Sequence, residues 1–178
     1  MAATLKLIIA EGLQSVTFAK ITKEANVGYS TVYHYYSTKE ALVTELFRNT
    51  RLHMSEHVLQ GFRSDRTVYE KVKHILSRTL TYAKDYPDHA FFIDNYCQSP
   101  FIEETVRTMQ PPSDLVVYEI IEEGQKQGVI REMDALFLCH IIVGFINSAV
   151  RGYYENKYSF EEKHVQFILE SCWKVIKV

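Results

Sequence analysis

The sequence predicts an all-α protein with an N-terminal three-helix, helix-turn-helix head, residues 1–47, and a larger C-terminal helical domain, residues 48–178. Apolar residues recur at intervals of three and four along almost the whole chain, and no run alternates with the two-residue period of a β-strand. Residue types that begin or end helices, such as Thr17 and Gly12, stand at the ends of these periodic segments. Hydrophobic residues make up 47% of the chain, which is enough for a buried core.

Two helices are expected before the first sharp turn. The first covers roughly residues 4–11 and ends at Gly12, a residue suited to a helix C-cap. The second begins after Thr17, whose hydroxyl can accept a hydrogen bond from a backbone N–H of the first turn. Three apolar side chains of this second helix share one face because they are three and four positions apart: Phe18, Ile21 and Ala25.

A tight turn at residues 26–28 and a short third helix follow. Asparagine is the residue other than glycine that best tolerates the left-handed conformation, so Asn26 is expected to open the turn. The third helix, residues 29–36, is too short to be stable alone. Val27 and Val32 are therefore expected to hold it against the second helix.

The third helix concentrates hydroxyl, imidazole and aromatic groups, a mixture suited to phosphate oxygens and the edges of bases. These groups belong to Tyr29, Ser30, Thr31, Tyr33, His34 and Tyr35. Ser37 and Glu40 then stand at the spacing of a capping box at the start of a fourth helix. Lys39 lies in its first turn, where a cation opposes the helix dipole unless an anion such as a DNA phosphate is nearby.

The fourth helix is expected to run from about Lys39 to Leu59 and to link the head to the second domain. Beyond it, prolines and capping residues divide the chain into further helices. These helices are expected at residues 67–86, from Asp88, after Pro100, at residues 111–127, at residues 134–156, and from Ser159 to the C-terminus, with Ser159 and Glu162 as a second capping box.

The last two predicted helices are apolar around more than one face. In residues 134–156, Gly144 and Gly152 also permit close approach by another helix. Contact with a twin chain would bury these faces in an interface of two helices from each subunit, which predicts a homodimer. The alternative is that both helices lie inside a monomer.

Residues 5–47 resemble the DNA-binding domain of the TetR family of bacterial transcriptional regulators, from LKLIIAEG through SVTFAKITKEANVGYSTVYHYYSTKEAL. The resemblance implies that Gly28, Tyr29, Ser30 and Thr31 begin the recognition helix, where family members contact bases. It implies that Thr17, Tyr33, His34 and Lys39 contact the sugar-phosphate backbone. Two residues depart from the family pattern, since Asn26 replaces the usual turn glycine and Gly28 replaces the common serine. The basic arm that often precedes the first helix in the family is also not seen.

The second domain is rich in aromatic residues, and the resemblance implies a cavity there for a small apolar or aromatic effector. An ordinary aromatic core would use the same residue types, so this alternative remains open. The candidate ligand-binding residues are Phe62, Tyr82, Phe91, Phe92, Tyr96, Tyr118, Phe137 and Phe145.

The net charge of −2 is unevenly distributed along the chain. Residues 1–51 carry six basic and four acidic side chains, whereas the remainder carries 14 basic and 18 acidic ones. A single head with so few cations is expected to bind DNA weakly, which favours the use of two heads.

The sequence shows no pattern typical of a catalytic site, a metal site or a membrane-spanning helix. No Gly-rich phosphate loop, carboxylate pair or activated cysteine is visible, so neither an enzymatic activity nor a cofactor is expected. His53 and His57 are four positions apart but lack a third ligand, so no metal is expected. The apolar run 136–146 is shorter than the ~20 residues of a membrane span, and three widely spaced cysteines fit a cytoplasmic protein.

These observations predict a ligand-responsive, homodimeric transcriptional repressor that a small molecule releases from double-stranded operator DNA. The alternative is a protein-interaction module of the same fold that binds another regulator in place of DNA. Activation in place of repression also remains open.

Overall fold

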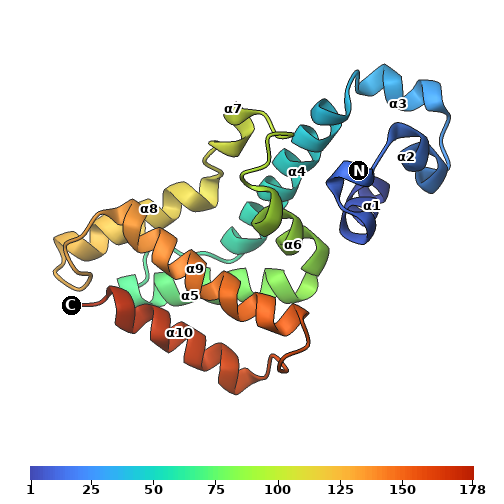
Figure 1. Cartoon of the computed structure of the whole chain (residues 1–178). Helices are drawn as coiled ribbons and strands as arrows, with labels where there is room; N and C mark the ends of the chain where they lie inside the picture. Colours follow the sequence, from blue (N-terminus) through green and yellow to red (C-terminus); the bar gives the residue numbers. More distant parts are fainter. The chain divides into compact units, whose positions relative to one another are not determined.

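The computed structural model describes residues 1–178 and is entirely helical apart from turns and one isolated bridge between Ile130 and Lys177 (Figure 1), which confirms the predicted fold class. The helices are α1 (Ala2–Glu11), η1 (Leu13–Ser15, a 3-10 turn), α2 (Phe18–Ala25), α3 (Tyr29–Tyr35), α4 (Lys39–Leu59), α5 (Val68–Asp85), α6 (Pro87–Tyr96), α7 (Glu104–Arg107), α8 (Pro112–Lys126), α9 (Ala135–Tyr154) and α10 (Glu162–Ile176).

The chain forms two compact units that do not follow the order of the sequence. The first unit comprises Met1–His53 and Tyr86–Met109, and the second comprises Met54–Asp85 and Gln110–Val178. The predicted boundary at residue 47 divides the chain in sequence order. By packing, however, α6 and α7 belong with the head although they come later in the sequence. Helix α4 is shared, because its first part lies in one unit and its last turns lie in the other.

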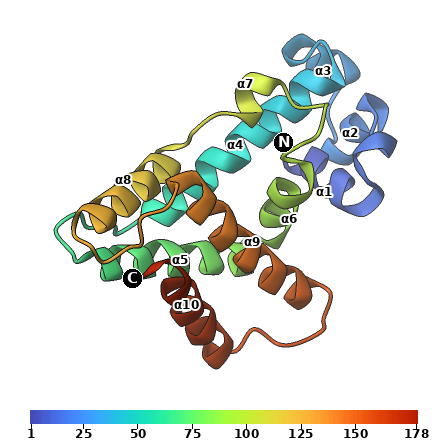
Figure 2. The same cartoon turned by 60° about the vertical axis from the view of Figure 1, so that its left-hand side comes forward.

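The head unit has one hydrophobic core, to which distant parts of the chain contribute. Helix α6 lies beside α1 in Figure 1 and in Figure 2, and the two helices are in direct contact. The core comprises Leu5, Ile8, Leu13, Val16, Ile21, Leu42, Val43, Leu46 and Phe47 from the N-terminal part, with Phe92, Ile102 and Val106 from the later segment. The first half of α4 therefore packs into the head, with Leu42, Leu46 and Phe47 almost fully buried.

The second unit is organised around α5, which contacts α8, α9 and α10. Its buried face includes Val72, Ile75, Leu76 and Leu80. An ion pair also joins α5 to α8, because the ammonium of Lys71, whose side chain is almost fully buried, lies 2.6 Å from a carboxylate oxygen of Glu123.

Several predicted helix ends are confirmed by their capping contacts. The Thr17 hydroxyl accepts a hydrogen bond from the backbone N–H of Lys20 at 3.4 Å. Asn26 has the expected left-handed conformation, with φ 52° and ψ 46°. At the start of α9, the Asp134 carboxylate accepts a hydrogen bond from the N–H of Phe137 at 2.8 Å.

Both predicted capping boxes are wrong in position. At α4 the cap is Thr38, whose hydroxyl accepts a hydrogen bond from the N–H of Ala41 at 3.1 Å. At α10 the box is formed by Glu161 and His164, because the helix begins two residues later than the spacing of Ser159 implied. More than one residue near each helix start has a side chain that can cap it, Ser37 and Thr38 at α4 and Ser159 and Glu161 at α10, so the spacing alone selected the wrong one.

The expected packing of α3 on α2 is confirmed only in part, since Val32 is half-buried but Val27 is largely exposed. Val27 was expected to hold α3 against α2, but its side chain is 41% exposed. Phe18 of α2 also packs against α3, because its ring meets the ring of Tyr33 edge to face, with centroids 4.7 Å apart. An aromatic pair therefore joins α2 to α3.

Gly124 allows close packing at the end of α8. A Cβ atom built there would lie 2.5 Å and 2.6 Å from side-chain atoms of Ile130 and 3.0 Å from Val68. We expect Gly124→Ala to lower the free energy of unfolding by about 1–3 kcal/mol, as overpacking of a core does. Glu119→Ala is the matched control, since Glu119 is an exposed residue of the same helix. Urea denaturation measures both variants, and equal stability of the two would contradict the close packing.

Candidate functional site

The α2–turn–α3 segment forms a helix-turn-helix. The left-handed residue Asn26 reverses the chain, its N–H donates to the carbonyl of Lys23, and the N–H of Val27 donates to the carbonyl of Thr22 at 3.1 Å. These bonds satisfy the last carbonyls of α2 and fix the direction in which α3 leaves the turn.

The structure brings the predicted DNA-contacting residues of α3 together on an exposed surface. Tyr29 and Tyr33 are 53% and 44% exposed, and Tyr35, which is not among the predicted contacts, is 73% exposed. The residues Thr17, Gly28, Ser30, Thr31 and His34 are also exposed, and no residue of α3 is buried. A helix of this length without a buried residue presents most of its side chains to a partner.

The aromatic side chains of this surface support one another. The rings of Tyr29 and Tyr33 have centroids 4.7 Å apart, and the Tyr29 hydroxyl donates to the Tyr33 hydroxyl at 3.0 Å. This hydrogen bond raises the pKa of the Tyr29 hydroxyl above its usual value, so the group stays neutral. With Phe18 behind Tyr33, the three rings form a row whose orientation is set before any DNA arrives.

Lys39 lies apart from this exposed row. Its ammonium donates to the carbonyls of Leu13, Gln14 and Val16 at 3.2, 3.4 and 3.2 Å, and it lies 4.8 Å from the centroid of the Phe101 ring. An ammonium has three N–H groups, and three acceptors occupy them. A phosphate contact by Lys39 would therefore require some of these bonds to break.

Most lysines of α1 and α2 are paired with acids. Lys6 lies 2.5 Å from a carboxylate oxygen of Glu24, and Lys20 lies 2.5 Å from one of Glu11. Lys23 is exposed and forms no ion pair. The positive potential of the head is thus smaller than its count of basic residues indicates.

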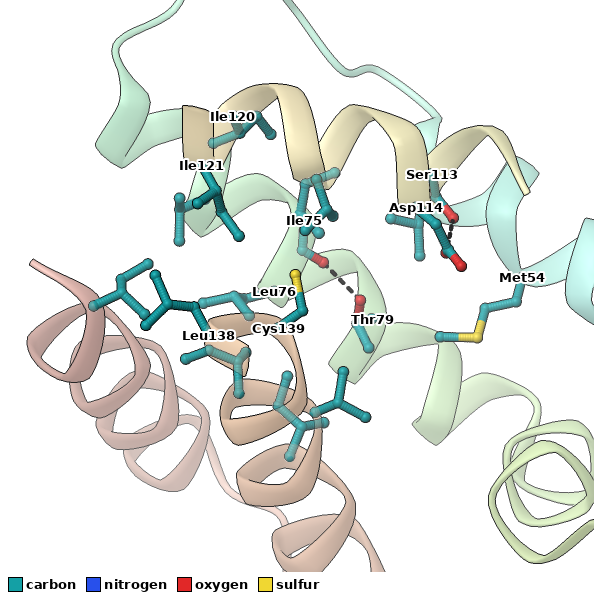
Figure 3. Close-up of a pocket in the computed structure, with 17 residues that line it drawn as sticks. Met54, Ile75, Leu76, Thr79, Ser113, Asp114, Ile120, Ile121, Leu138 and Cys139 are labelled. Atoms are coloured by element: carbon teal, nitrogen blue, oxygen red, sulfur yellow. Dashed lines mark hydrogen bonds between the residues drawn. The ribbon is translucent and has the colours of Figure 1, made fainter. Parts of the chain in front are cut away.

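The second unit contains an apolar cavity of about 170 Å³ (Figure 3). Residues from the end of α4, from α5, α8 and α9, and Ile176 of α10 line it. The labelled side chains of α8, such as Ile121, and those of α9, such as Leu138, point toward one another across it. Nearly all of its surface comes from aliphatic carbon and sulfur atoms.

The polar groups at the cavity wall have partners within the protein. The Thr79 hydroxyl donates to the carbonyl of Ile75 at 2.8 Å, and the Ser113 hydroxyl donates to the Asp114 carboxylate at 3.2 Å. Burial, aided by the negative charges of Asp114 and Asp134, raises the pKa of the Cys139 thiol to about 11. The thiol therefore stays protonated and is a poor nucleophile.

None of the eight aromatic residues predicted to bind a ligand lines this cavity. Phe92 and Tyr96 pack in or against the head core, and Phe91, in the same unit, is exposed. Tyr82 is fully buried, Phe62 and Tyr118 are half-buried, and Phe137 and Phe145 are exposed on α9. The actual lining is aliphatic and follows the helical spacing of an ordinary core, so no feature of the sequence distinguishes it.

An exposed apolar surface covers the outer side of the last two helices, as their breadth predicted. It comprises Leu136, Phe137, Ile141, Val143 and Phe145 of α9, with Phe167 and Val175 of α10. Contrary to the expectation from the run 136–146, the whole of α9 is long and apolar enough to cross a membrane, with mean hydropathy 1.6 in a window that is 22% buried. One such helix is weak evidence for a membrane span, because a helix that packs on two sides has the same composition.

A helix-turn-helix head joined to a helical domain with a cavity and an exposed apolar face defines a class of DNA-binding regulators. Residues 1–46 match the family described as bacterial regulatory proteins, tetR family, and residues 47–178 match the tetracyclin repressor-like C-terminal domain. The chain therefore belongs to the tetR family of bacterial regulatory proteins and is a DNA-binding transcriptional regulator.

Relatives and solved structures agree with this assignment. An uncharacterised HTH-type transcriptional regulator of Haemophilus influenzae is 21% identical, with 98% of this chain and 92% of that protein covered. The fatty acid metabolism regulator protein of Bacillus subtilis is 22% identical over 89% of this chain and 84% of its own.

Two solved structures share the fold over nearly the whole chain. A TetR family transcription regulator from Marinobacter aquaeolei superposes with a TM-score of 0.89 at 16% identity, over 99% of this chain and 92% of that one. The regulator FadR from Bacillus subtilis, in complex with stearoyl-CoA, superposes with a TM-score of 0.76 at 18% identity, over 98% and 94%.

The inward position of Lys39 makes a specific prediction for salt dependence. We expect Lys39→Met to weaken DNA binding and lower thermal stability, because three carbonyls lose their donor, while the slope of log K against log salt changes by less than about 0.3. Fluorescence anisotropy with a DNA duplex at several salt concentrations measures the slope. A decrease of about 0.9 would instead identify Lys39 as a phosphate contact.

Proposed function

We propose that this regulator is a homodimeric repressor that a small apolar effector releases from its operator. The observation that carries the proposal is the pairing of an exposed, prearranged recognition surface on α3 with an exposed apolar face on α9 and α10. Either surface alone also occurs in proteins of different function, but together they supply two DNA-reading heads and the means to join them. We expect the protein in the cytoplasm, where its DNA lies.

On DNA, each α3 helix would enter a major groove, with two heads reading half-sites about 34–36 Å apart. Tyr29, Ser30 and Thr31 at the start of α3 would meet base edges, with the backbone of Gly28 close to them. Tyr33, His34 and Thr17 would meet the sugar-phosphate backbone, and Lys39 is the least accessible of the predicted contacts. Hydroxyl and imidazole groups suit both kinds of contact.

The homodimer would form through α9 and α10. Phe137, Ile141 and Phe145 recur on α9 at helical spacing, and Phe167 of α10 is 68% exposed. An apolar face of this extent is costly in water and is characteristic of an interface. Gly144 adds no side chain to this face and would let a partner helix approach closely.

The effector would bind in the aliphatic cavity of the second unit. The similarity to a FadR that holds stearoyl-CoA supports a ligand in this domain. Ligand and DNA would each weaken the binding of the other by the same factor, and a useful coupling amounts to about 1–3 kcal/mol.

A protein-interaction module that binds another regulator is the second candidate. The ion pairs of Lys6 and Lys20 favour it, because they leave the head few unpaired cations for phosphates. A gel-shift experiment with the DNA that flanks its own gene separates the two functions, since only the repressor retards that DNA specifically.

The dimer interface is tested by Phe167→Glu, which places a charge on the apolar face. We expect this variant to sediment as a monomer at concentrations where the native protein is a dimer, and to lose operator binding. Leu115→Glu is the matched control, since Leu115 is an exposed apolar residue of α8 outside this face. A Phe167→Glu protein that remains dimeric would contradict the proposed interface.

The roles of the tyrosines are tested by comparing operator and unrelated DNA. We expect Tyr33→Phe to weaken binding to both by a similar factor of about ten, because a phosphate loses a donor. Tyr29→Ala is expected to change the ratio between the two affinities. Tyr35→Phe removes the hydroxyl of an exposed neighbour with no assigned contact and should leave both affinities unchanged. Wild-type affinities in the Tyr33 and Tyr29 variants would remove the proposed roles.

A further inference from the structure

The cavity of the second unit has an unusual composition for a regulatory ligand site. Among the 17 residues that line it there is no lysine, arginine or histidine, and no aromatic ring. The wall consists of valine, leucine, isoleucine and methionine side chains with four residues that carry a polar or thiol group: Thr79, Ser113, Asp114 and Cys139. Of these, Asp114 alone carries a charge, and that charge is negative.

The uncharged polar groups are also committed to the protein. Thr79 donates to a carbonyl of its own helix, and Ser113 donates to Asp114. Neither hydroxyl proton is therefore available to a ligand oxygen. An anionic group that enters the cavity loses hydrogen bonds to water, and these two side chains donate none in return.

We propose that the cavity binds a small, uncharged, hydrocarbon-like effector and excludes carboxylates and acyl-CoA thioesters. The inference rests on the proposed effector site and deepens it by naming the chemical class of the ligand. Recognition would come from the shape of the aliphatic wall and from the removal of apolar surface from water.

The volume of the cavity supports a small ligand. At about 170 Å³ it is close to an engineered cavity of about 150 Å³ that stays dry and binds benzene. Sites for drug-sized molecules are larger, at about 300–1,000 Å³. A long acyl chain such as that of stearoyl-CoA exceeds this volume, although the two proteins share their fold.

The lack of a basic side chain in the wall supports the exclusion of anions. A buried carboxylate without a cationic partner must either take up a proton or lose its hydration without compensation. An amphipathic acid would therefore bind far more weakly than a neutral molecule with the same apolar part.

Isothermal titration of the full chain with two matched probes tests the proposal without DNA. Propylbenzene and phenylacetate share a ring and differ in the carboxylate. We expect propylbenzene to bind, phenylacetate to bind at least about 30-fold more weakly, and stearoyl-CoA to show no binding in the same range. Comparable affinity for phenylacetate, tight binding of stearoyl-CoA, or no binding of propylbenzene would overturn the proposal.

Two neighbouring positions of α8 locate the binding event. Val117 lines the cavity, whereas Val116, also half-buried, does not. We expect Val117→Phe to fill the space and weaken propylbenzene binding at least tenfold, and Val116→Phe to leave it within about twofold. Equal affinity in both variants would place the ligand elsewhere and overturn the proposal.

A variant that gains a cation keeps the charge argument testable if Val117→Phe does not fold. Met54 lies at the edge of the cavity in Figure 3, so Met54→Lys places an ammonium there. We expect it to raise phenylacetate affinity at least tenfold relative to propylbenzene. An unchanged ratio of the two affinities would show that the missing cation is not what excludes acids.

The operator experiment is separate from these titrations. If propylbenzene binds in the cavity but operator affinity stays the same, the proposed release from DNA fails while the ligand class stands. If acids bind as well as propylbenzene and displace the DNA, the ligand class fails while the proposed function stands.

Discussion

The core of the head unit depends on side chains from a later segment, residues 86–109, which follows an excursion of the chain into the second unit. Phe92, Ile102 and Val106 complete the core around Phe47, whose ring lies 5.9 Å from that of Phe92. The hydroxyl of Thr44 adds a polar link, because it donates to the carbonyl of Phe101 and accepts from the N–H of Glu103. Residues 1–47 alone would expose the apolar surface that Phe92, Ile102 and Val106 cover, so we expect the DNA-reading part to be less stable without them.

If the proposed effector binds in the cavity of the second unit, the covalent chain provides a route from it to the head. The chain passes between the units within α4, between Asp85 and Tyr86, and between Met109 and Gln110. The last passage leads within a few residues to Ser113, Asp114 and Val117, which line the cavity on α8. A ligand that moves the start of α8 would therefore act a few residues from Val106, which is part of the head core. Coupling requires only that the two arrangements differ in their affinity for the ligand.

The sequence predicted features set by local chemistry and missed those set by three-dimensional context. Thr17 and Asn26 were placed correctly because a cap and a left-handed turn depend on a few neighbouring residues. The inward position of Lys39 could not be foreseen, since its carbonyl partners come from a turn more than twenty positions earlier and Phe101 from far beyond. The cavity was missed for a different reason, because Val72, Ile75 and Leu76 have the spacing of a filled core and a void leaves no mark in a sequence.

The two apolar sides of helix α9 explain why its composition resembles that of a membrane span. Leu138, Cys139, Ile142 and Ile146 line the cavity, while Phe137, Ile141 and Phe145 are exposed on the outside. A helix that serves two apolar surfaces must be hydrophobic around most of its circumference, whatever surrounds it. If the outer side is the dimer interface, one rigid element touches both the ligand and the partner subunit. A small rotation of α9 on ligand binding would then change the contact that sets the separation of the two heads, without any further connecting part.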